Sequence, residues 1–175
     1  MKKEYIFIIV LIVIIGGVSA LAVSVNKKNS IEANPVLATA LATTAQCLQD
    51  SGAKFYGASW CPHCARQKAL FMKSIKTVPY VECAEGGAGS PQTQVCIDAK
   101  IQSYPTWEFA TDLRGSLEIA PADLAVISGC SVTEEGKMEL AKQKDVFMSE
   151  MEPAQQDSYV AEIKRLLDAV TALNK

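Results

Sequence analysis

Hydrophobic positions between residues 34 and 130 recur with two spacings, which predict alternating helices and strands. In chain order we expect a helix over 34–51, a strand over 53–58, a helix from Pro62 with Ala65, Ala69, Met72 and Ile75 on one face, a strand over 78–83, a short helix over 92–100, strands over 106–110 and 116–119, and a helix over 121–128. Helices join the early strands, which favours parallel pairing there, whereas the turn at 111–115 predicts an antiparallel hairpin. The expected fold is therefore α/β, with a mixed central sheet flanked by helices.

From Ser131 onward the pattern is helical, with one break at Pro153. One face of the last helix carries Tyr159, Ile163, Leu166, Val170 and Leu173. Such a stripe packs either on its own domain or on a partner. Because it is shorter than three heptads, packing on its own domain is favoured.

The first 25 residues include a long apolar run. Residues 5–25 carry no charge and are long enough to cross the roughly 30 Å hydrocarbon core of a membrane as a helix. The alternative is a cleavable signal peptide, because Ala20-Leu21-Ala22 fits the small-x-small cleavage pattern. Both interpretations place the rest of the chain outside the cytoplasm. We expect an anchor or signal at 1–25, a tether at 26–33, a domain at 34–130 and a helical extension at 131–175.

The composition narrows the classes of function. The 175 residues carry 17 basic and 19 acidic side chains without a basic run, so nucleic-acid binding is not expected. Six cysteines are too many to be incidental, and they suit an oxidising compartment.

The strongest chemical signal is Trp60-Cys61-Pro62-His63-Cys64, at the junction of a predicted strand and a predicted helix. Unpaired N–H groups and the dipole at the start of that helix stabilise a Cys61 thiolate, which predicts that Cys61 is the exposed nucleophile and Cys64 the more buried thiol. Cys64, one turn later, can resolve a mixed disulfide on Cys61. Pro62 fixes the helix start, and a cationic His63 between the sulfurs adds to the stabilisation of the thiolate. Stabilising the Cys61 thiolate favours the reduced form of the cysteine pair, so the disulfide form readily oxidises other thiols.

Two other interpretations of this motif are a zinc site and an inert crosslink. A zinc ribbon requires a second closely spaced cysteine pair, and the cysteines at 47, 83, 96 and 130 offer none. We therefore expect redox chemistry by the cysteines themselves, without a metal or another cofactor.

Ser103-Tyr104-Pro105-Thr106 follows the motif by some forty residues and leads into a predicted strand. In this order and position the sequence resembles the thioredoxin fold, in which a cis-proline loop faces the active-site sulfurs. The resemblance implies that Pro105 is the cis-proline and that the backbone of Tyr104 pairs with a substrate strand. Trp60, beside the nucleophile, is a third candidate for substrate binding. Taken alone, Tyr-Pro indicates only a turn before a strand.

The segments AKFYGASWCPHCARQKALF, VPYVECAEGG and IQSYPTWEF resemble the thioredoxin-like domain attached to bacterial and plant homologues of vitamin K epoxide reductase. Through CPHC they are also similar to the DsbA class of periplasmic thiol oxidants. The likeness covers roughly residues 47–130. There are two departures: these 175 residues have no counterpart of the four-helix membrane domain, and Phe55 stands where thioredoxins carry a buried acid. The resemblance therefore implies a thiol oxidant whose redox partner is a separate membrane protein.

The other four cysteines suggest structural disulfides. Cys83 ends a predicted strand and Cys96 lies on the next helix, across a Gly-rich loop, and the fused family has a matching pair. A bridge there is expected to stabilise the fold by about 3 kcal/mol. The alternative is a second redox pair that relays electrons to the motif. Cys47 and Cys130 are then left to pair with each other, unless both are free buried thiols.

These features predict a membrane-tethered, extracytoplasmic thiol–disulfide oxidoreductase that donates a Cys61–Cys64 disulfide to substrate proteins. We expect it to be reoxidised by a membrane enzyme of the vitamin K epoxide reductase or DsbB type. Two alternatives stay open. One is a reductase or isomerase of the same fold, for instance in cytochrome c maturation. The other is a redox-inert thioredoxin-like adaptor that binds partners through its C-terminal helices, and the intact cysteine pair argues against it.

Overall fold

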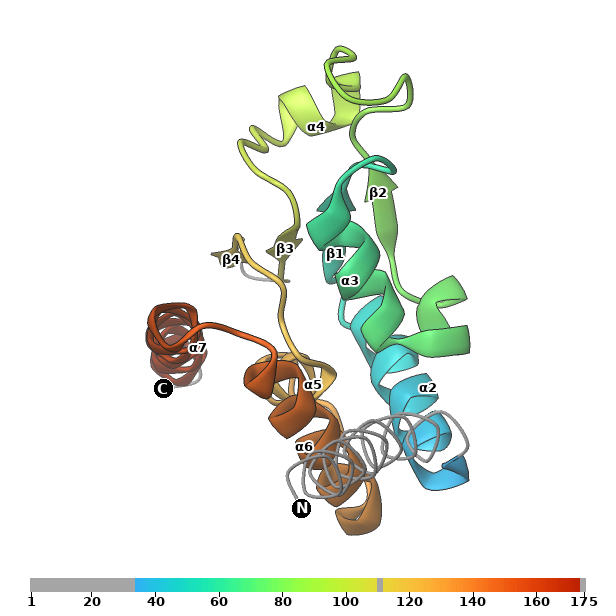
Figure 1. The fold of residues 1–175 in the computed structure, drawn as a ribbon, viewed down its shortest axis with the longest axis vertical. Helices are drawn as coiled ribbons and strands as arrows, with labels where there is room; N and C mark the ends of the chain where they lie inside the picture. The colour runs from blue at the N-terminus through green and yellow to red at the C-terminus, as the bar shows by residue number, and fades with distance from the viewer. Residues whose placement is uncertain (1–33, 110–111, 174–175) are drawn as a thin grey trace, which may run out of the picture. The chain divides into compact units, whose positions relative to one another are not determined.

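The computed structural model describes residues 34–109 and 112–173 (Figure 1). Its elements are α2 (Pro35–Asp50), β1 (Lys54–Gly57), α3 (Pro62–Leu70), the 3-10 helix η1 (Met72–Lys76), β2 (Tyr80–Glu82), α4 (Gln94–Asp98), β3 (Thr106–Glu108), β4 (Arg114–Gly115), α5 (Pro121–Ile127), α6 (Glu134–Ser149) and α7 (Pro153–Leu173). The anchor or signal expected at 1–25 and the tether at 26–33 lie outside these residues. Among the helices of the described part, none combines the length and apolarity needed to span a membrane.

The four strands form one mixed sheet in the order β2-β1-β3-β4. Strand β1 pairs in parallel with β2, with Phe55 opposite Tyr80, and antiparallel with β3, with Phe55 opposite Trp107. Strands β3 and β4 form an antiparallel hairpin. Figure 1 shows α4 beyond one end of the sheet and α2, α5 and α6 towards the other. The mixed α/β fold predicted from the sequence is confirmed, and the arrangement fits the thioredoxin-like fold.

Aromatic side chains join α3 to the sheet. Phe55 stacks on Trp107 with ring centroids 4.9 Å apart, and Phe71 contacts the same indole ring at 6.3 Å. The buried indole N–H donates to the side-chain oxygen of Gln67 at 3.1 Å, and this oxygen also accepts the backbone N–H of Ile119 at 2.6 Å. Because a buried donor without a partner costs about 1–3 kcal/mol, the Gln67 amide fixes α3 against the sheet.

The helix predicted from Pro62 has a different buried face from the one expected. The four residues of the predicted face, Ala65, Ala69, Met72 and Ile75, are exposed or half-buried. Helix α3 instead buries Cys64 and Gln67, and Phe71 is buried directly after its end. The spacing of apolar residues predicted the wrong face because the buried side chains of α3 are a thiol, Cys64, and an amide, Gln67. A pattern built from alanine, methionine and isoleucine does not include them.

The hairpin also closes earlier than predicted. The backbone N–H of Phe109 donates to the carbonyl of Leu113 at 2.9 Å, so β4 is Arg114–Gly115 rather than a strand over 116–119. Gly115 pairs with Trp107, and a Cβ added at Gly115 would lie 3.0 Å from a methyl group of Leu166. The close approach of α7 therefore favours glycine in this short strand.

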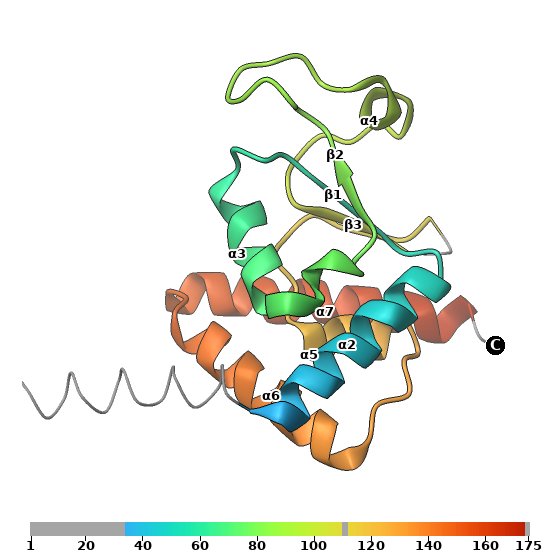
Figure 2. The same ribbon diagram turned by 90° about the vertical axis from the view of Figure 1, so that its right-hand side faces the viewer.

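The two C-terminal helices pack on the rest of the described domain. Helix α6 contacts α2 and α5, and α7 contacts α5 and β4, so that α7 crosses behind α5 in Figure 2. Of the predicted stripe, Tyr159, Ile163 and Leu166 are buried, Val170 is half-buried and Leu173 is exposed. The Tyr159 hydroxyl donates to Asp123 and accepts the N–H of Ala120. Packing of the stripe on its own domain is thus confirmed for its first three residues.

Candidate active site

Cys61 occupies the N-cap position of α3. Its backbone is extended, with φ −79° and ψ 120°, and Pro62 is the first helical residue. The chain turns tightly between β1 and this position, because the N–H of Cys61 donates to the carbonyl of Ala58 at 3.1 Å. The expectation that Cys61 is exposed is wrong for this free thiol, because the residue is only 6% exposed and counts as buried. The thiol therefore lies where the unpaired N–H groups and the dipole of α3 stabilise negative charge.

The residues expected to bind substrate surround this thiol. The Cys61 Sγ donates a hydrogen bond to the carbonyl oxygen of Tyr104 at 3.8 Å, and the peptide bond between Tyr104 and Pro105 is cis. The ring of Trp60, 42% exposed, meets the ring of Tyr104 edge-on at 6.3 Å. The structure thus brings Trp60, Tyr104 and Pro105 together beside Cys61.

Cys64 is the more deeply buried of the two thiols, at 1% exposure. Burial raises the pKa of the Cys64 thiol to about 12, and a hydrogen bond and the charge interaction with Cys61 act in the same direction. The backbone N–H of Ala58 and the charge of Lys68 oppose them. At neutral pH the Cys64 thiol therefore keeps its proton, which suits a resolving residue better than an attacking one.

Gly57, the last residue of β1, makes room for the Cys64 sulfur. A Cβ at this position would lie 2.9 Å from the Cys64 Sγ and 2.9 Å from Cε2 of Tyr80. The Cys64 and Tyr80 side chains thus occupy the space that a Cβ at position 57 would need. The Nζ of Lys68 lies 3.5 Å from the centroid of the Tyr80 ring. Glycine at the end of β1 is therefore a steric requirement for seating Cys64 and Tyr80 together.

Glu82 links the loop before the motif to the end of β2. Its Oε1 accepts the backbone N–H groups of Ser59 and Ala84, each at 3.0 Å, and its Oε2 accepts the Tyr80 hydroxyl at 2.8 Å. Burial alone would raise the pKa of Glu82, but these hydrogen bonds and the charge of Lys68 lower it overall. No motif in the sequence points to Glu82. Its position directly before Cys83 at a strand end was the only available signal.

The His63 ring is oriented differently from the expectation that it lies between the sulfurs. Its Nδ1 lies 2.7 Å from Oε1 of Glu118, a residue that is 9% exposed and follows β4. Arg66 donates to both oxygens of the same carboxylate, and its Nη2 is 2.8 Å from the His63 Nδ1. Arginine only donates and a carboxylate only accepts, so Nδ1 can serve only one of these two contacts at a time, and the tautomer of the ring decides which. In the part of the chain that the structure describes, no hydrogen bond joins His63 to Cys61 or Cys64.

All six cysteines lie within the described residues, and four of them form two disulfides. The pairs are Cys47–Cys130 and Cys83–Cys96, which leaves Cys61 and Cys64 as free thiols. Within the described ranges, no group of three or more His, Cys, Asp and Glu side chains has the geometry to hold a metal ion.

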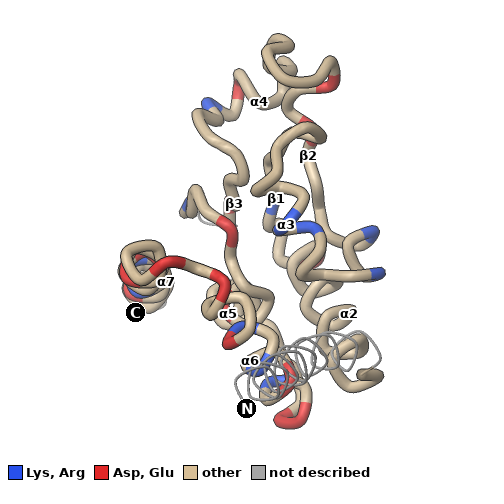
Figure 3. Tube along the Cα trace, in the orientation of Figure 1, with Lys and Arg blue, Asp and Glu red and all other residues tan. Residues whose placement is uncertain are grey.

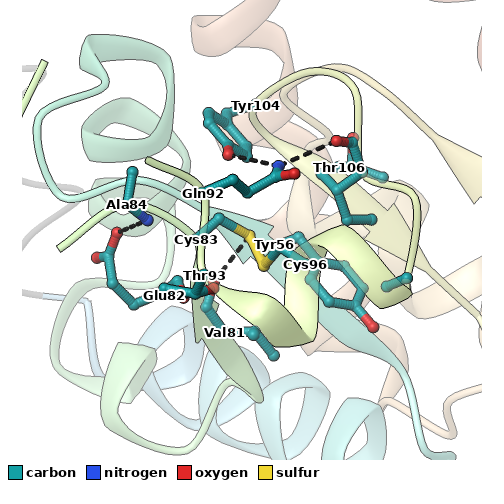
Figure 4. The surroundings of a disulfide bond; sticks show 12 residues. Tyr56, Val81, Glu82, Cys83, Ala84, Gln92, Thr93, Cys96, Tyr104 and Thr106 are labelled. Carbon is teal, nitrogen blue, oxygen red and sulfur yellow. Dashed lines mark hydrogen bonds between the residues drawn. A yellow bond between two sulfur atoms is a disulfide. The ribbon is translucent and has the colours of Figure 1, made fainter. Parts of the chain in front are cut away.

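Figure 4 shows the Cys83–Cys96 disulfide with Gln92 and Tyr104 in its surroundings. Both cysteines are buried in one cluster, and Tyr104 packs against it. Gln92, in the loop that this disulfide closes, donates from Nε2 to the Tyr104 hydroxyl at 2.7 Å and to the carbonyl of Ile101 at 3.0 Å. The crosslinked loop therefore supports the residue that faces the Cys61 thiol.

Comparison with known proteins points to the same chemistry. No protein-family model matches the chain. A curated relative, the thiol-disulfide oxidoreductase LTO1 of Arabidopsis thaliana, is 41% identical over 93 residues. The match covers 51% of this chain and 24% of the relative, so the chain corresponds to about a quarter of that protein. Over about half of its length the chain is thus similar to a thiol-disulfide oxidoreductase.

Proposed function

We propose that this protein is a thiol–disulfide oxidoreductase that donates a Cys61–Cys64 disulfide to substrate proteins. The observation that carries the proposal is the asymmetry of the two thiols. Cys61 lies at the start of α3 against the Tyr104 carbonyl, whereas burial raises the pKa of Cys64 to about 12. The similarity to LTO1 supports the same class of activity.

The proposed reaction begins when a substrate thiolate attacks the Cys61 Sγ of the protein disulfide. The Cys61–Cys64 bond breaks, and Cys64 leaves as a thiolate that takes up a proton because its pKa is raised. A second substrate thiolate then attacks the substrate sulfur of the mixed disulfide and releases Cys61 as a thiolate stabilised by the start of α3. Two electrons pass from the substrate, which gains a disulfide, to the protein, which becomes a dithiol.

We further propose that the domain works on the extracytoplasmic side of a membrane. The uncharged residues 5–25 support a tether or an export signal, and two disulfides suit an oxidising compartment. Each turnover leaves a dithiol that must be reoxidised. A separate membrane enzyme of the vitamin K epoxide reductase or DsbB type is the partner that the sequence resemblance favours.

One observation supports the alternative of a reductase or isomerase of the same fold. The Nδ1 of His63 contacts Glu118, and Arg66 shares that carboxylate. A cationic side chain that is paired with a carboxylate stabilises a nearby thiolate less than the same cation does without the carboxylate. This arrangement lowers the reduction potential relative to a site in which His63 contacts the sulfur.

A glutathione equilibrium titration of the Cys61–Cys64 pair distinguishes the two directions. We expect a potential well above the roughly −270 mV of thioredoxin and nearer the roughly −120 mV of DsbA. A value at or below that of thioredoxin would contradict disulfide donation and favour the reductase. The Cys64→Ser variant, which cannot form the internal disulfide, is the control for signals from the other four cysteines.

A further inference from the structure

A groove of about 960 Å³ begins beside the cysteine motif and extends to the corner between α6 and α7. His63, Tyr104 and Pro105 line it at the motif, and Met151 and Gln155 line it at the corner. Its volume lies at the upper end of the roughly 300–1,000 Å³ that is typical of ligand sites. The groove therefore has room for a segment of polypeptide, and it starts at the residues that surround the Cys61 thiol.

The C-terminal helices supply a whole wall of this groove. Phe147 and Met151 contribute apolar surface, and Leu117 faces the groove from the segment between β4 and α5. Tyr104, whose carbonyl contacts the Cys61 thiol, and Pro105 line the groove together with residues of α6 and α7. Helices α6 and α7 thus lie where they can contact the substrate residues that flank the substrate's reacting cysteine.

The charges along the groove are predominantly acidic. Glu118, Glu150 and Glu162 line it, against the single always-charged base Arg66. Glu118 is hydrogen-bonded to Arg66, and Glu162 is hydrogen-bonded to Arg165. Glu150 is exposed, and its charge interacts with Arg66, whose hydrogen bonds go to Glu118 and His63. Figure 3 shows acidic positions along the turn between α6 and α7, and Glu150 is the C-cap residue that directly follows α6.

We propose that this groove binds the cysteine-containing segment of a substrate protein that carries a lysine or arginine near its cysteine, and that Glu150 selects this basic side chain. The inference rests on the proposed function and names the substrate class of the same site. A basic side chain can pair with the exposed carboxylate of Glu150, whereas an acidic side chain at the same place is repelled by it. Because Glu150 is exposed to solvent, the preference is expected to be modest, about two- to five-fold.

The test uses the full chain with Cys61 and Cys64 as a disulfide, and two reduced peptides that each contain a cysteine pair. The peptides are identical except for a lysine or a glutamate near the first cysteine. The measured quantity is the ratio of the second-order rate constants for oxidation of the lysine and the glutamate peptide. We expect a ratio of about two to five at low ionic strength, and a ratio closer to one when salt is added.

Variants of Glu150 separate charge selection from a structural effect. We expect Glu150→Gln to bring the ratio to about one, and Glu150→Lys to invert it so that the glutamate peptide reacts faster. Glu135→Lys is the matched control, because Glu135 is exposed on the first turn of α6 and does not line the groove, and it should keep the wild-type ratio.

The outcomes also separate this inference from the proposed function. Equal oxidation of both peptides by the wild-type chain, or a ratio that Glu150→Lys leaves unchanged, would overturn the selection by Glu150 while the proposed function stands. Failure to oxidise either peptide would overturn the proposed function and this inference with it.

Discussion

The Cys61 thiol donates a hydrogen bond to the carbonyl oxygen of Tyr104, with 3.8 Å between the sulfur and the oxygen. The Tyr104 side chain is held from two directions, by the Trp60 ring and by the amide of Gln92. The nucleophile at the start of α3 and the loop expected to bind substrate therefore form one site, although 43 positions separate them in the chain.

The two thiols of the motif are expected to differ sharply in reactivity towards iodoacetamide. Because burial raises the pKa of Cys64 to about 12, very little of this thiol is ionised at pH 8. Brief alkylation of the reduced protein at pH 8, followed by peptide mass spectrometry, should therefore find the label on Cys61. Labelling of Cys64 first, or of both at equal rates in the folded protein, would contradict the assigned roles.

Substitutions of His63 and Glu118 are expected to move the reduction potential in opposite directions. His63→Ala removes a group that, when cationic, stabilises the Cys61 thiolate, and should lower the potential. Glu118→Gln removes the carboxylate that pairs with Arg66 and contacts His63, and should raise it. Each shift is expected to be about 10–20 mV, from charge interactions of about 0.5–1 kcal/mol. Glutathione titration measures both, and shifts of the same sign would show that the network does not act through charge.

The two disulfides are expected to contribute to stability and not to electron transfer. On chain-entropy grounds, loss of Cys83–Cys96 should lower the free energy of unfolding by about 3 kcal/mol, and loss of Cys47–Cys130 by about 4.5 kcal/mol. Paired Cys→Ala variants followed by thermal unfolding measure these losses. The exchange rate of Cys61 should stay largely intact in both. A variant without Cys83 and Cys96 that stays folded but no longer turns over would instead support an electron relay.

Glu82 is expected to make the protein sensitive to acid. Its pKa is lowered from the ordinary 4.5, so its carboxylate contributes stability above about pH 4.5 that is lost as the pH falls towards the folded-state pKa. Glu82→Gln removes this contribution and should flatten the loss of stability below pH 4.5. Urea unfolding at a series of pH values measures the effect, with the exposed Glu85→Gln as the control. An unchanged acid slope in Glu82→Gln would contradict the role given to its hydrogen bonds.

Local signals in the sequence were sufficient to place the main elements. Pro62 after Cys61 located the start of α3, and the spacing of Tyr159, Ile163 and Leu166 identified the buried face of α7. These features depend on residues within a few turns of one another, which is why a single sequence reveals them.

Features that depend on distant contacts were not predictable in this way. Gln67 is buried because its amide pairs with Trp107 and Ile119, which are far from it in the chain, so the apolar face predicted for this helix was wrong. Glu118 and Glu82 are single acids in unremarkable surroundings. Their importance arises only when the fold brings them to His63 and to Ser59.

The central claim, that the Cys61–Cys64 pair donates a disulfide through Cys61, is tested most directly by one anaerobic turnover. The full chain with this pair oxidised is mixed with a reduced peptide that contains two cysteines, and the thiols of both are counted by mass spectrometry after alkylation. We expect one peptide disulfide to form for each protein molecule that gains two thiols, at Cys61 and Cys64. We also expect Cys64→Ser, activated as a mixed disulfide on Cys61, to exchange it with the peptide. A protein disulfide that persists beside an unoxidised peptide would contradict the account.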